Sequence, residues 1–125
     1  MTRPIVLVVE DEPAILAMSR MILAREGYPV VTAEDGPTAV ARFQDAADAV
    51  GVVVLDLNIP GFGGWAVLAE LRRIRPGVRV LVTTGSVGAD DSGTALHEPP
   101  TAVLPKPYRP SDLIETVARV LAAPA

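Results

Sequence analysis

Residues 52–61 read Val-Val-Val-Leu-Asp-Leu-Asn-Ile-Pro-Gly, an apolar run that ends in the carboxylate of Asp56 and then in turn-forming residues. Short apolar runs bounded by such residues are typical of buried β-strands. Polar residues also follow three other apolar runs: Glu10-Asp11 after 5–9, Thr83-Thr84 after 78–82, and Pro105-Lys106 after 101–104. Four predicted strand ends therefore supply carboxylates, hydroxyls and an ammonium.

The composition indicates one soluble domain. A chain of 125 residues, half of them apolar, can bury about two thirds of its surface without metal or disulfide crosslinks. It contains no cysteine, which excludes disulfides and thiol chemistry and is compatible with a reducing compartment. The N-terminus has no cleavage signature, and no apolar run approaches the ~18 residues of a membrane span. We expect a cytoplasmic protein that makes no membrane contact.

The charge argues against a nucleic-acid partner. The net charge is −4, although Arg72, Arg73, Arg75 and Arg79 form a basic stretch. A nucleic-acid-binding domain usually has a pI above about 9 and a broad basic face. Cations near the end of a helix also complement its dipole, so we interpret these arginines as a solvated helix end.

The periodicity predicts a parallel α/β fold. Strand-like runs alternate with segments of helical pattern, as in right-handed βαβ units. The runs at 5–9, 51–55 and 78–83 are almost wholly apolar, as expected of central strands that helices cover on both faces. The remaining strands are predicted near 29–33 and 101–105, and the helices near 13–26, 37–47, 64–74 and 111–122. Helix 13–26 should bury Ile15, Met18, Ile22 and either Met21 or Leu23, and Ser111 or Asp112 should cap the last helix.

Residues 85–100 are the exception to the alternation. A fourth helix belongs there, but the segment contains three glycines and ends in Pro99-Pro100, which oppose helix formation. We expect that helix to be weak, frayed or absent. No linker or repeat divides the chain, so residues 1–125 are predicted to form a single domain with no output domain.

The predicted strand ends should converge in one pocket, because ligands of open α/β sheets bind beyond the carboxyl ends of the strands. Glu10, Asp11 and Asp56 would then be neighbours and would repel one another unless a cation lay between them. Oxygen ligands with room for water suit Mg²⁺. A zinc site lacks ligands, because the chain has no cysteine and only His97 as a histidine.

A carboxylate beside a metal ion can act as a nucleophile toward phosphorus, as in enzymes that form an aspartyl-phosphate. Asp56 is the candidate. Phosphoryl transfer depends mainly on positioning and charge neutralisation, which the hydroxyl of Thr84 and the ammonium of Lys106 can supply.

Four motifs occur in order along the chain: Val9-Glu10-Asp11-Glu12, Leu55-Asp56-Leu57-Asn58-Ile59-Pro60-Gly61 with Gly64, Val82-Thr83-Thr84-Gly85, and Leu104-Pro105-Lys106-Pro107-Tyr108. With these motifs the sequence resembles the receiver domain of two-component response regulators, over Ile5 to Leu121. The resemblance implies a flavodoxin-like, doubly wound five-stranded parallel sheet with strand order 2-1-3-4-5 and helices on both faces. It also implies Mg²⁺-dependent transfer of a phosphoryl group to Asp56 from a sensor histidine kinase or a histidine phosphotransfer protein.

The resemblance assigns a role to each residue of the site. Asp11 and Asp56 would bind the metal by side chain, Asn58 by its backbone carbonyl, and Glu10 directly or through water. Lys106 would form an ion pair with the phosphoryl group, and Thr84 would donate a hydrogen bond to it. The peptide bond before Pro107 would be cis, and Asn58 and Ser86 would occupy the positions that tune hydrolysis.

One residue departs from the family pattern. Many members carry Tyr or Phe three residues before the lysine, where this chain has Val103. Without that aromatic side chain, we hypothesise that phosphorylation acts by ordering residues 85–100.

We interpret the chain as a stand-alone receiver that switches the binding of an unknown downstream protein or relays phosphate, and not as a metabolic enzyme. A homodimer through the last helix is possible in this scheme. Two alternatives stay open at this stage: a degenerate receiver that binds partners without phosphorylation, and a Mg²⁺-dependent phosphatase with an aspartate nucleophile. The phosphatase usually needs an acid two residues after its nucleophile, where this chain has Asn58.

Among the aromatic residues, Trp65 should pack in the core, whereas Tyr108 could pack there or border a partner surface.

Overall fold

The computed structural model describes residues 3–61, 63–85 and 100–122. Five parallel strands form one sheet in the order β2-β1-β3-β4-β5, which confirms the predicted doubly wound fold. No described helix is long and apolar enough to cross a bilayer. Ser86, His97 and the predicted weak fourth helix lie outside the described residues. The elements are β1 (Ile5–Val9), α1 (Pro13–Arg25), β2 (Val30–Ala33), α2 (Gly36–Ala46), β3 (Val50–Asp56), α3 (Gly64–Ile74), β4 (Val80–Thr84), β5 (Ala102–Pro105) and α5 (Pro110–Ala122).

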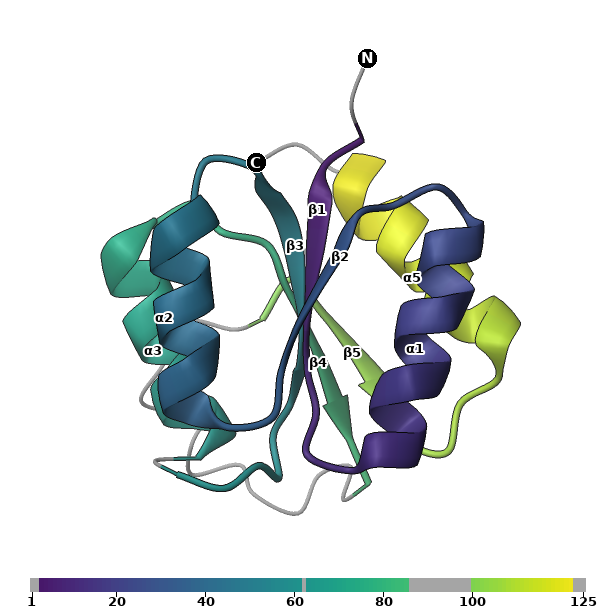
Figure 1. The fold of residues 1–125 in the computed structure, drawn as a ribbon, viewed down its shortest axis with the longest axis horizontal. Helices are drawn as coiled ribbons and strands as arrows, with labels where there is room; N and C mark the ends of the chain where they lie inside the picture. Colours follow the sequence, from purple (N-terminus) through teal and green to yellow (C-terminus); the bar gives the residue numbers. More distant parts are fainter. Residues whose placement is uncertain (1–2, 62, 86–99, 123–125) are drawn as a thin grey trace.

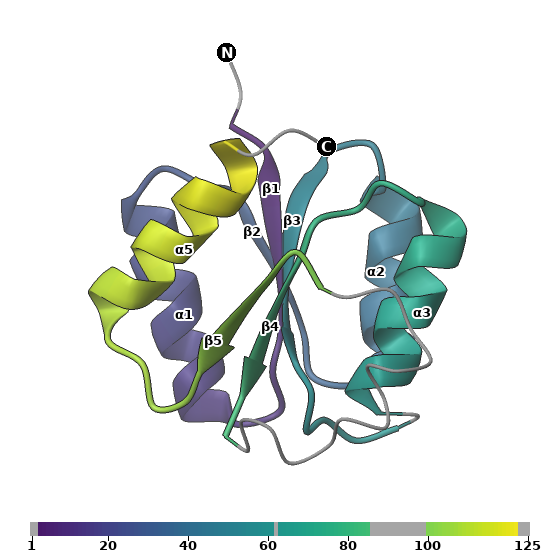
Figure 2. The same cartoon turned by 180° about the vertical axis from the view of Figure 1, so that it is seen from behind.

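The sheet lies between two layers of helices. Figure 1 shows α2 and α3 on one face and α1 and α5 on the other, and Figure 2 shows the same layers from behind. Side chains alternate between the two faces along each strand. Thus Leu7 and Val9 of β1 join the core under α2 and α3, whereas Val6 and Val8 join the core under α1 and α5. The apolar runs therefore build two cores that hold the strand ends in register.

Several strand boundaries differ from the prediction by one or two residues, and a contact explains two of these differences. Strand β3 extends to Asp56, which is 3% exposed and lies opposite Thr83 of β4. The carboxylate is therefore fixed by the sheet itself rather than carried on a loop. Strand β4 begins at Val80 instead of residue 78, because the N–H of Val78 donates to the carbonyl of Arg75 at 3.0 Å and closes a turn.

Helix α1 buries fewer apolar residues than predicted. Pro13 occupies its first turn, as expected, and Ile22 and Leu23 are buried. Met21, by contrast, is 51% exposed. Of the two alternatives for this position of the stripe, Leu23 is buried in the core and Met21 is not.

Helix α5 starts one residue earlier than predicted, at Pro110. The backbone N–H of Arg109 donates to the Asp112 carboxylate at 2.9 Å, and the N–H of Asp112 donates back to the Arg109 carbonyl at 2.9 Å. Asp112 thus closes the helix start from its third helical position, as the acidic residue of a capping box does.

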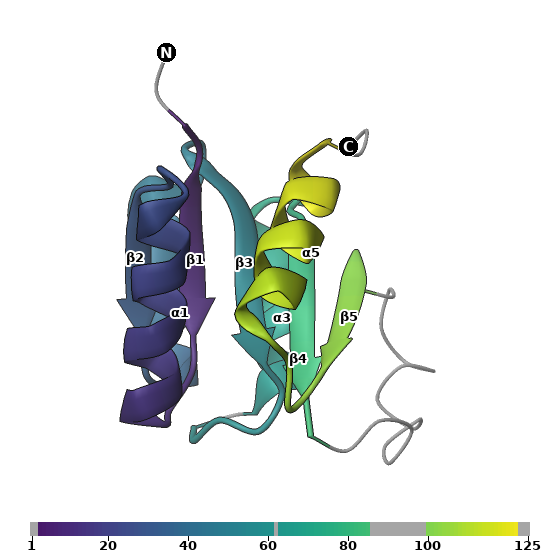
Figure 3. The ribbon, with the colours of Figure 1, turned by 90° about the vertical axis from the view of Figure 1, so that its right-hand side faces the viewer.

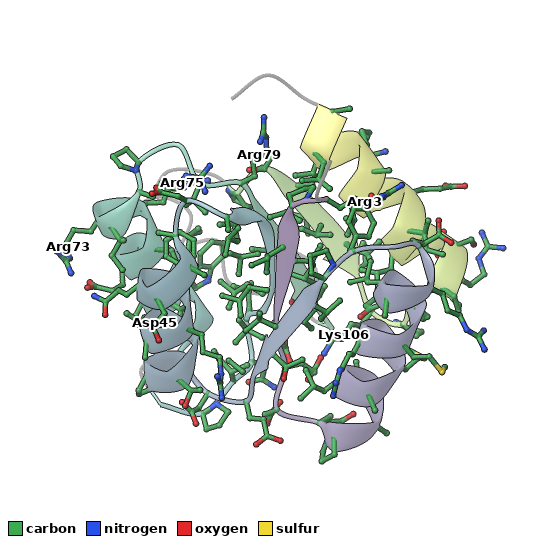
Figure 4. All side chains as sticks on the ribbon, turned by 45° about the horizontal axis from the view of Figure 1, so that its top comes forward. Arg3, Asp45, Arg73, Arg75, Arg79 and Lys106 are labelled. Atoms are coloured by element: carbon green, nitrogen blue, oxygen red, sulfur yellow. The ribbon has the colours of Figure 1, made fainter. Side chains whose placement is uncertain are left out.

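The arginine stretch makes contacts within the protein. Nη1 of Arg75 donates to the carbonyls of Ala47 and Val50 at 2.7 and 2.6 Å, and Arg73 forms an ion pair with Glu70. Figure 4 shows Arg75 and Arg79 at the end of the molecule away from Lys106. Arg75 therefore stabilises the connection between α2 and β3.

Helix α2 begins with a side-chain cap whose contribution depends on pH. The Asp35 carboxylate accepts the N–H of Thr38 at 2.8 Å, and this hydrogen bond lowers the pKa of Asp35 below its usual value of 3.8. A carboxyl group with a lowered pKa in the folded state stabilises that state above the unfolded pKa, and loses this effect as the pH falls through the folded pKa.

Asp35→Ala is therefore expected to lower the unfolding temperature by a few degrees at neutral pH, because it removes the cap. The difference from the wild type should shrink as the pH is lowered below 3.8. Thermal unfolding followed by circular dichroism at several pH values measures both effects. Asp35→Asn, which keeps a capping side chain, serves as the control. A difference that is the same at every pH would contradict this account.

Candidate functional site

Three carboxylates meet at the carboxyl edge of the sheet. The arrowheads of the strands point to the same end of the molecule in Figure 3, and β1 and β3 are neighbours. One carboxylate oxygen from each of Glu10, Asp11 and Asp56 lies within 4.8 Å of the others. Glu10 and Asp56 are each 3% exposed, whereas Asp11 is open to solvent. The convergence predicted from the strand ends is therefore present.

Lys106 joins two of these carboxylates. Its Nζ donates to Glu10 Oε1 at 2.8 Å and to Asp56 Oδ2 at 3.1 Å, and its side chain is only 20% exposed. Lys106 is the only lysine of the chain, beside ten arginines. An ammonium is a compact donor of three hydrogen bonds that can change partners more easily than a planar guanidinium. The site thus holds a cation whose donors can turn toward a new anion.

Backbone donors fix the two buried carboxylates. Oδ1 of Asp56 accepts the N–H of Asn58 at 3.0 Å, while Oε2 of Glu10 accepts the N–H of Glu12 at 3.2 Å. In each carboxylate, therefore, one oxygen accepts a hydrogen bond from a backbone N–H and the other accepts one from Lys106. These contacts orient both groups toward the centre of the site.

Burial and the ion pairs of Lys106 act in opposite directions on the pKa values of Glu10 and Lys106. Burial raises the pKa of Glu10 above 4.5, and the hydrogen bond from Lys106 opposes this only in part. For Lys106, burial acts to lower the pKa, but the hydrogen bonds to Glu10 and Asp56 outweigh it and raise the pKa above 10.5. Lys106 is accordingly an ammonium at neutral pH, beside a carboxyl group that is costly to ionise.

Thr84 and Lys106 are linked through their backbones. Thr84 ends β4 and is half-buried, and its carbonyl accepts the N–H of Lys106 at 2.8 Å. The peptide bond between Lys106 and Pro107 is cis, the geometry that the resemblance implies. The pairing of β4 with β5 therefore sets the hydroxyl and the ammonium on neighbouring strand ends.

The start of α3 holds the loop after Asp56. The N–H of Gly64 donates to the Leu57 carbonyl at 3.2 Å, and a Cβ atom at position 64 would lie 2.4 Å from the Leu57 Cα. Only glycine allows this close approach. The contact lies between Asp56 and Asn58 in sequence, so it positions both.

The donor set fits a hard divalent cation. Three carboxylates lie together with one ammonium, and at an effective dielectric constant of 20 two like charges 4 Å apart repel by about 4 kcal/mol. The side chains offer oxygen and no histidine or cysteine, which suits Mg²⁺ and does not suit zinc. The exposed position of Asp11 leaves water access on one side, as Mg²⁺ requires.

Comparison with known proteins agrees with this geometry. A family model described as the response regulator receiver domain matches residues 6–118. The chain belongs to this family. Receiver domains take part in two-component signalling, so the chain carries a signalling domain with an acidic pocket rather than the site of a metabolic enzyme.

Individual relatives are full regulators of greater length. The transcriptional regulatory protein TcrA of Mycobacterium tuberculosis is 39% identical over 108 residues, which are 86% of this chain and 42% of that protein. The sensory transduction protein RegX3 of the same species is 34% identical over 116 residues, which are 93% and 50%. The chain thus spans about half the length of the curated relatives it matches.

The fold also matches solved receivers. A CheY-like receiver domain protein from Methanospirillum hungatei JF-1 superposes with a TM-score of 0.87 at 28% identity, covering 96% of this chain and 94% of that one. The chemotaxis response regulator CheY4 of Vibrio cholerae gives 0.83 at 29% identity, covering 95% and 99%. Most of the described fold is therefore shared with single receiver domains.

Some contacts were not predicted from the sequence. The ion pair of Lys106 with Glu10 joins residues 96 positions apart, and a second link joins Ser19 of α1 to Tyr108. Tyr108 packs partly against the core under α1 and α5, and Trp65 packs against the opposite core. Val103, in the place of the family's aromatic residue, is 50% exposed on β5.

Proposed function

We propose that this receiver accepts a phosphoryl group on Asp56 from a sensor histidine kinase or a histidine phosphotransfer protein. The observation that carries the proposal is the position of the Asp56 carboxylate: buried at the end of β3, 3.1 Å from the Lys106 ammonium and beside two further acids. A carboxylate held this way has an oxygen nucleophile, a cation and a backbone donor in one place.

The site has the ligands for Mg²⁺. Side-chain oxygens of Glu10, Asp11 and Asp56, with the backbone carbonyl of Asn58, would hold the ion. When bound, Mg²⁺ would neutralise the charge of the carboxylates and of an incoming phosphoryl group. Asp11 is the exposed one of the three carboxylates, so the site is accessible to solvent and ligands on that side.

Side chains of the protein perform the transfer of the phosphoryl group. An oxygen of Asp56 attacks phosphorus, the bond between phosphorus and the donor nitrogen breaks, and the electron pair of that bond stays with the imidazole. Lys106 exchanges its carboxylate partners for a phosphoryl oxygen, and the Thr84 hydroxyl donates a second hydrogen bond. Loss of the phosphoryl group to water reverses the charge change, at a rate that Asn58 and Ser86 would tune.

Phosphorylation should in turn change the affinity for a downstream protein, because the modified residue adds charge at a site formed by the ends of four strands. Action as a stand-alone receiver in the cytoplasm is part of the same proposal. Immunodetection of the native protein, by mass and by cell fraction, tests both points.

Incubation with Mg²⁺ and an acyl phosphate donor tests the central step. The wild type is expected to gain the mass of one phosphoryl group that is stable to acid and labile to base, whereas Asp56→Asn gains none. Omission of Mg²⁺ should abolish the gain, and its restoration should recover it. A modified Asp56→Asn protein would place the acceptor elsewhere. A wild type that binds Mg²⁺ but stays unmodified with this donor and with phosphorylated histidine kinases would contradict the proposal.

A further inference from the structure

A buried hydroxyl links helix α1 to the segment that carries Lys106. Ser19 is 1% exposed, and its Oγ lies 3.4 Å from the hydroxyl oxygen of Tyr108. The two residues are 89 positions apart in sequence. Serine in the middle of a helix has no advantage of propensity over alanine, and a buried hydroxyl without a partner is costly. The contact with Tyr108 provides the buried Ser19 hydroxyl with a hydrogen-bond partner.

The segment after Lys106 is held at both ends. On the side of the sheet, the N–H of Lys106 donates to the Thr84 carbonyl at 2.8 Å. On the far side, Asp112 closes the start of α5 through the Arg109 backbone. Tyr108 lies between these two points, and its ring packs partly against the core under α1 and α5. Its hydroxyl contact is a polar link from α1 to this segment.

Packing alone does not confine this segment. A hollow of about 450 Å³ lies beside it, lined by Ile15, Met18, Gly85, Lys106, Pro107 and Tyr108. Side chains that border a hollow have fewer neighbours on that side and are held less firmly by contact. A hydrogen bond from the far end of the Tyr108 ring therefore restricts a movement that the hollow would otherwise permit.

We propose that Ser19 and Tyr108 are positioning residues for Lys106. Their hydroxyl contact holds the backbone of residues 106–108 against α1 and thereby keeps the ammonium between Glu10 and Asp56. This inference rests on the proposed function, since its effect is read in phosphoryl transfer. Neither residue touches the reacting atoms, and they act only through the lysine.

Three variants test the link: Tyr108→Phe, Ser19→Ala, and the two combined. Each single variant is expected to lower the initial rate of Asp56 phosphorylation by about twofold, the effect of a long and weak hydrogen bond. The double variant should be no slower than the slower single one, because all three remove the same contact. Thr116→Val is the matched control, because it removes a buried hydroxyl of α5 that bonds to the Asp112 carbonyl within its own helix. It should leave the rate unchanged.

A second readout does not depend on phosphorylation. Because Lys106 is the only lysine, protein labelled with ¹⁵N-lysine reports one side-chain Nζ by NMR. Its signal should move in Tyr108→Phe and Ser19→Ala and stay in place in Thr116→Val. A general loss of stability would not distinguish these variants in that way.

The outcomes separate the two proposals. If the wild type is never phosphorylated but the Nζ signal shifts as expected, the proposed function fails and the positioning role stands. Folded Tyr108→Phe and Ser19→Ala proteins with wild-type rates and an unmoved Nζ signal would overturn the positioning role alone. Additive losses in the double variant would also overturn it, because they would show two independent effects.

Discussion

Lys106→Met is expected to slow phosphorylation of Asp56 by about 100-fold while it tightens the binding of Mg²⁺. The loss follows from the removal of a preorganised cation beside the buried Asp56 carboxylate, where one such donor typically contributes 10²- to 10³-fold to the rate. Lys106 is 20% exposed, and its Nζ lies 3.1 Å from Asp56 Oδ2. Initial rates with an acyl phosphate donor measure the effect.

The gain in metal affinity has a separate cause. The ammonium occupies oxygens of Glu10 and Asp56, two of the three carboxylates that would bind the ion. Without Lys106 these groups lose a competing cation, and the repulsion between that cation and Mg²⁺ disappears as well. Calorimetric titration with Mg²⁺ should show an affinity about tenfold higher than that of the wild type.

Arg109→Gln controls for charge alone. Arg109 lies three residues away and faces solvent, where it pairs with Asp112 at 3.5 Å. Its removal should change neither the rate nor the metal affinity appreciably, because exposed ion pairs contribute little. Lys106→Met with a wild-type rate would show that the ammonium is not part of the transfer. Weaker Mg²⁺ binding in that variant would show that Lys106 does not compete for the carboxylates.

The sheet could be predicted because the sequence pattern and its physical cause are both local. The continuous apolar runs of β1, β3 and β4 mark strands covered on both faces, and these three are central in the observed order. Strand ends were less predictable, because they depend on partners. Thr83 of β4 extends β3 to Asp56, and a hydrogen bond from Val78 to Arg75 delays the start of β4.

Only the part of the site that follows from the strand topology could be predicted. Parallel strands bring their carboxyl ends together, so Glu10, Asp11 and Asp56 had to meet. The sharing of Lys106 between Glu10 and Asp56 depends on side-chain placement across 96 and 50 residues, for which the spacing gives no signal. The role of Ser19 could not be predicted for the same reason, because a single serine in an apolar helix gives no sign of a distant partner. Met21 faces outward, whereas Ser19, Ile22 and Leu23 form the buried face of α1.

Gly64→Ala is expected to destabilise the fold by about 2–3 kcal/mol and to weaken Mg²⁺ binding together with it. An added Cβ would lie 2.4 Å from the Leu57 Cα and 2.8 Å from its carbonyl oxygen. Both are backbone atoms, so no side chain can rotate away to make room. The loop must move instead, and Leu57 lies between the carboxylate of Asp56 and the carbonyl of Asn58.

Urea unfolding measures the change in stability, and titration with Mg²⁺ of the variant at low temperature, where it stays folded, measures the change in the site. Gly77→Ala is the matched control: position 77 has no atom within 4 Å of an added Cβ and no positive φ. There alanine should be neutral or stabilising by up to about 1 kcal/mol, because it restricts the unfolded chain. If Gly64→Ala lost stability but bound Mg²⁺ as the wild type does, the contact with Leu57 would serve the fold alone. A loss in both measurements would mean that the start of α3 sets the geometry of the acidic pocket as well as the packing of the helix.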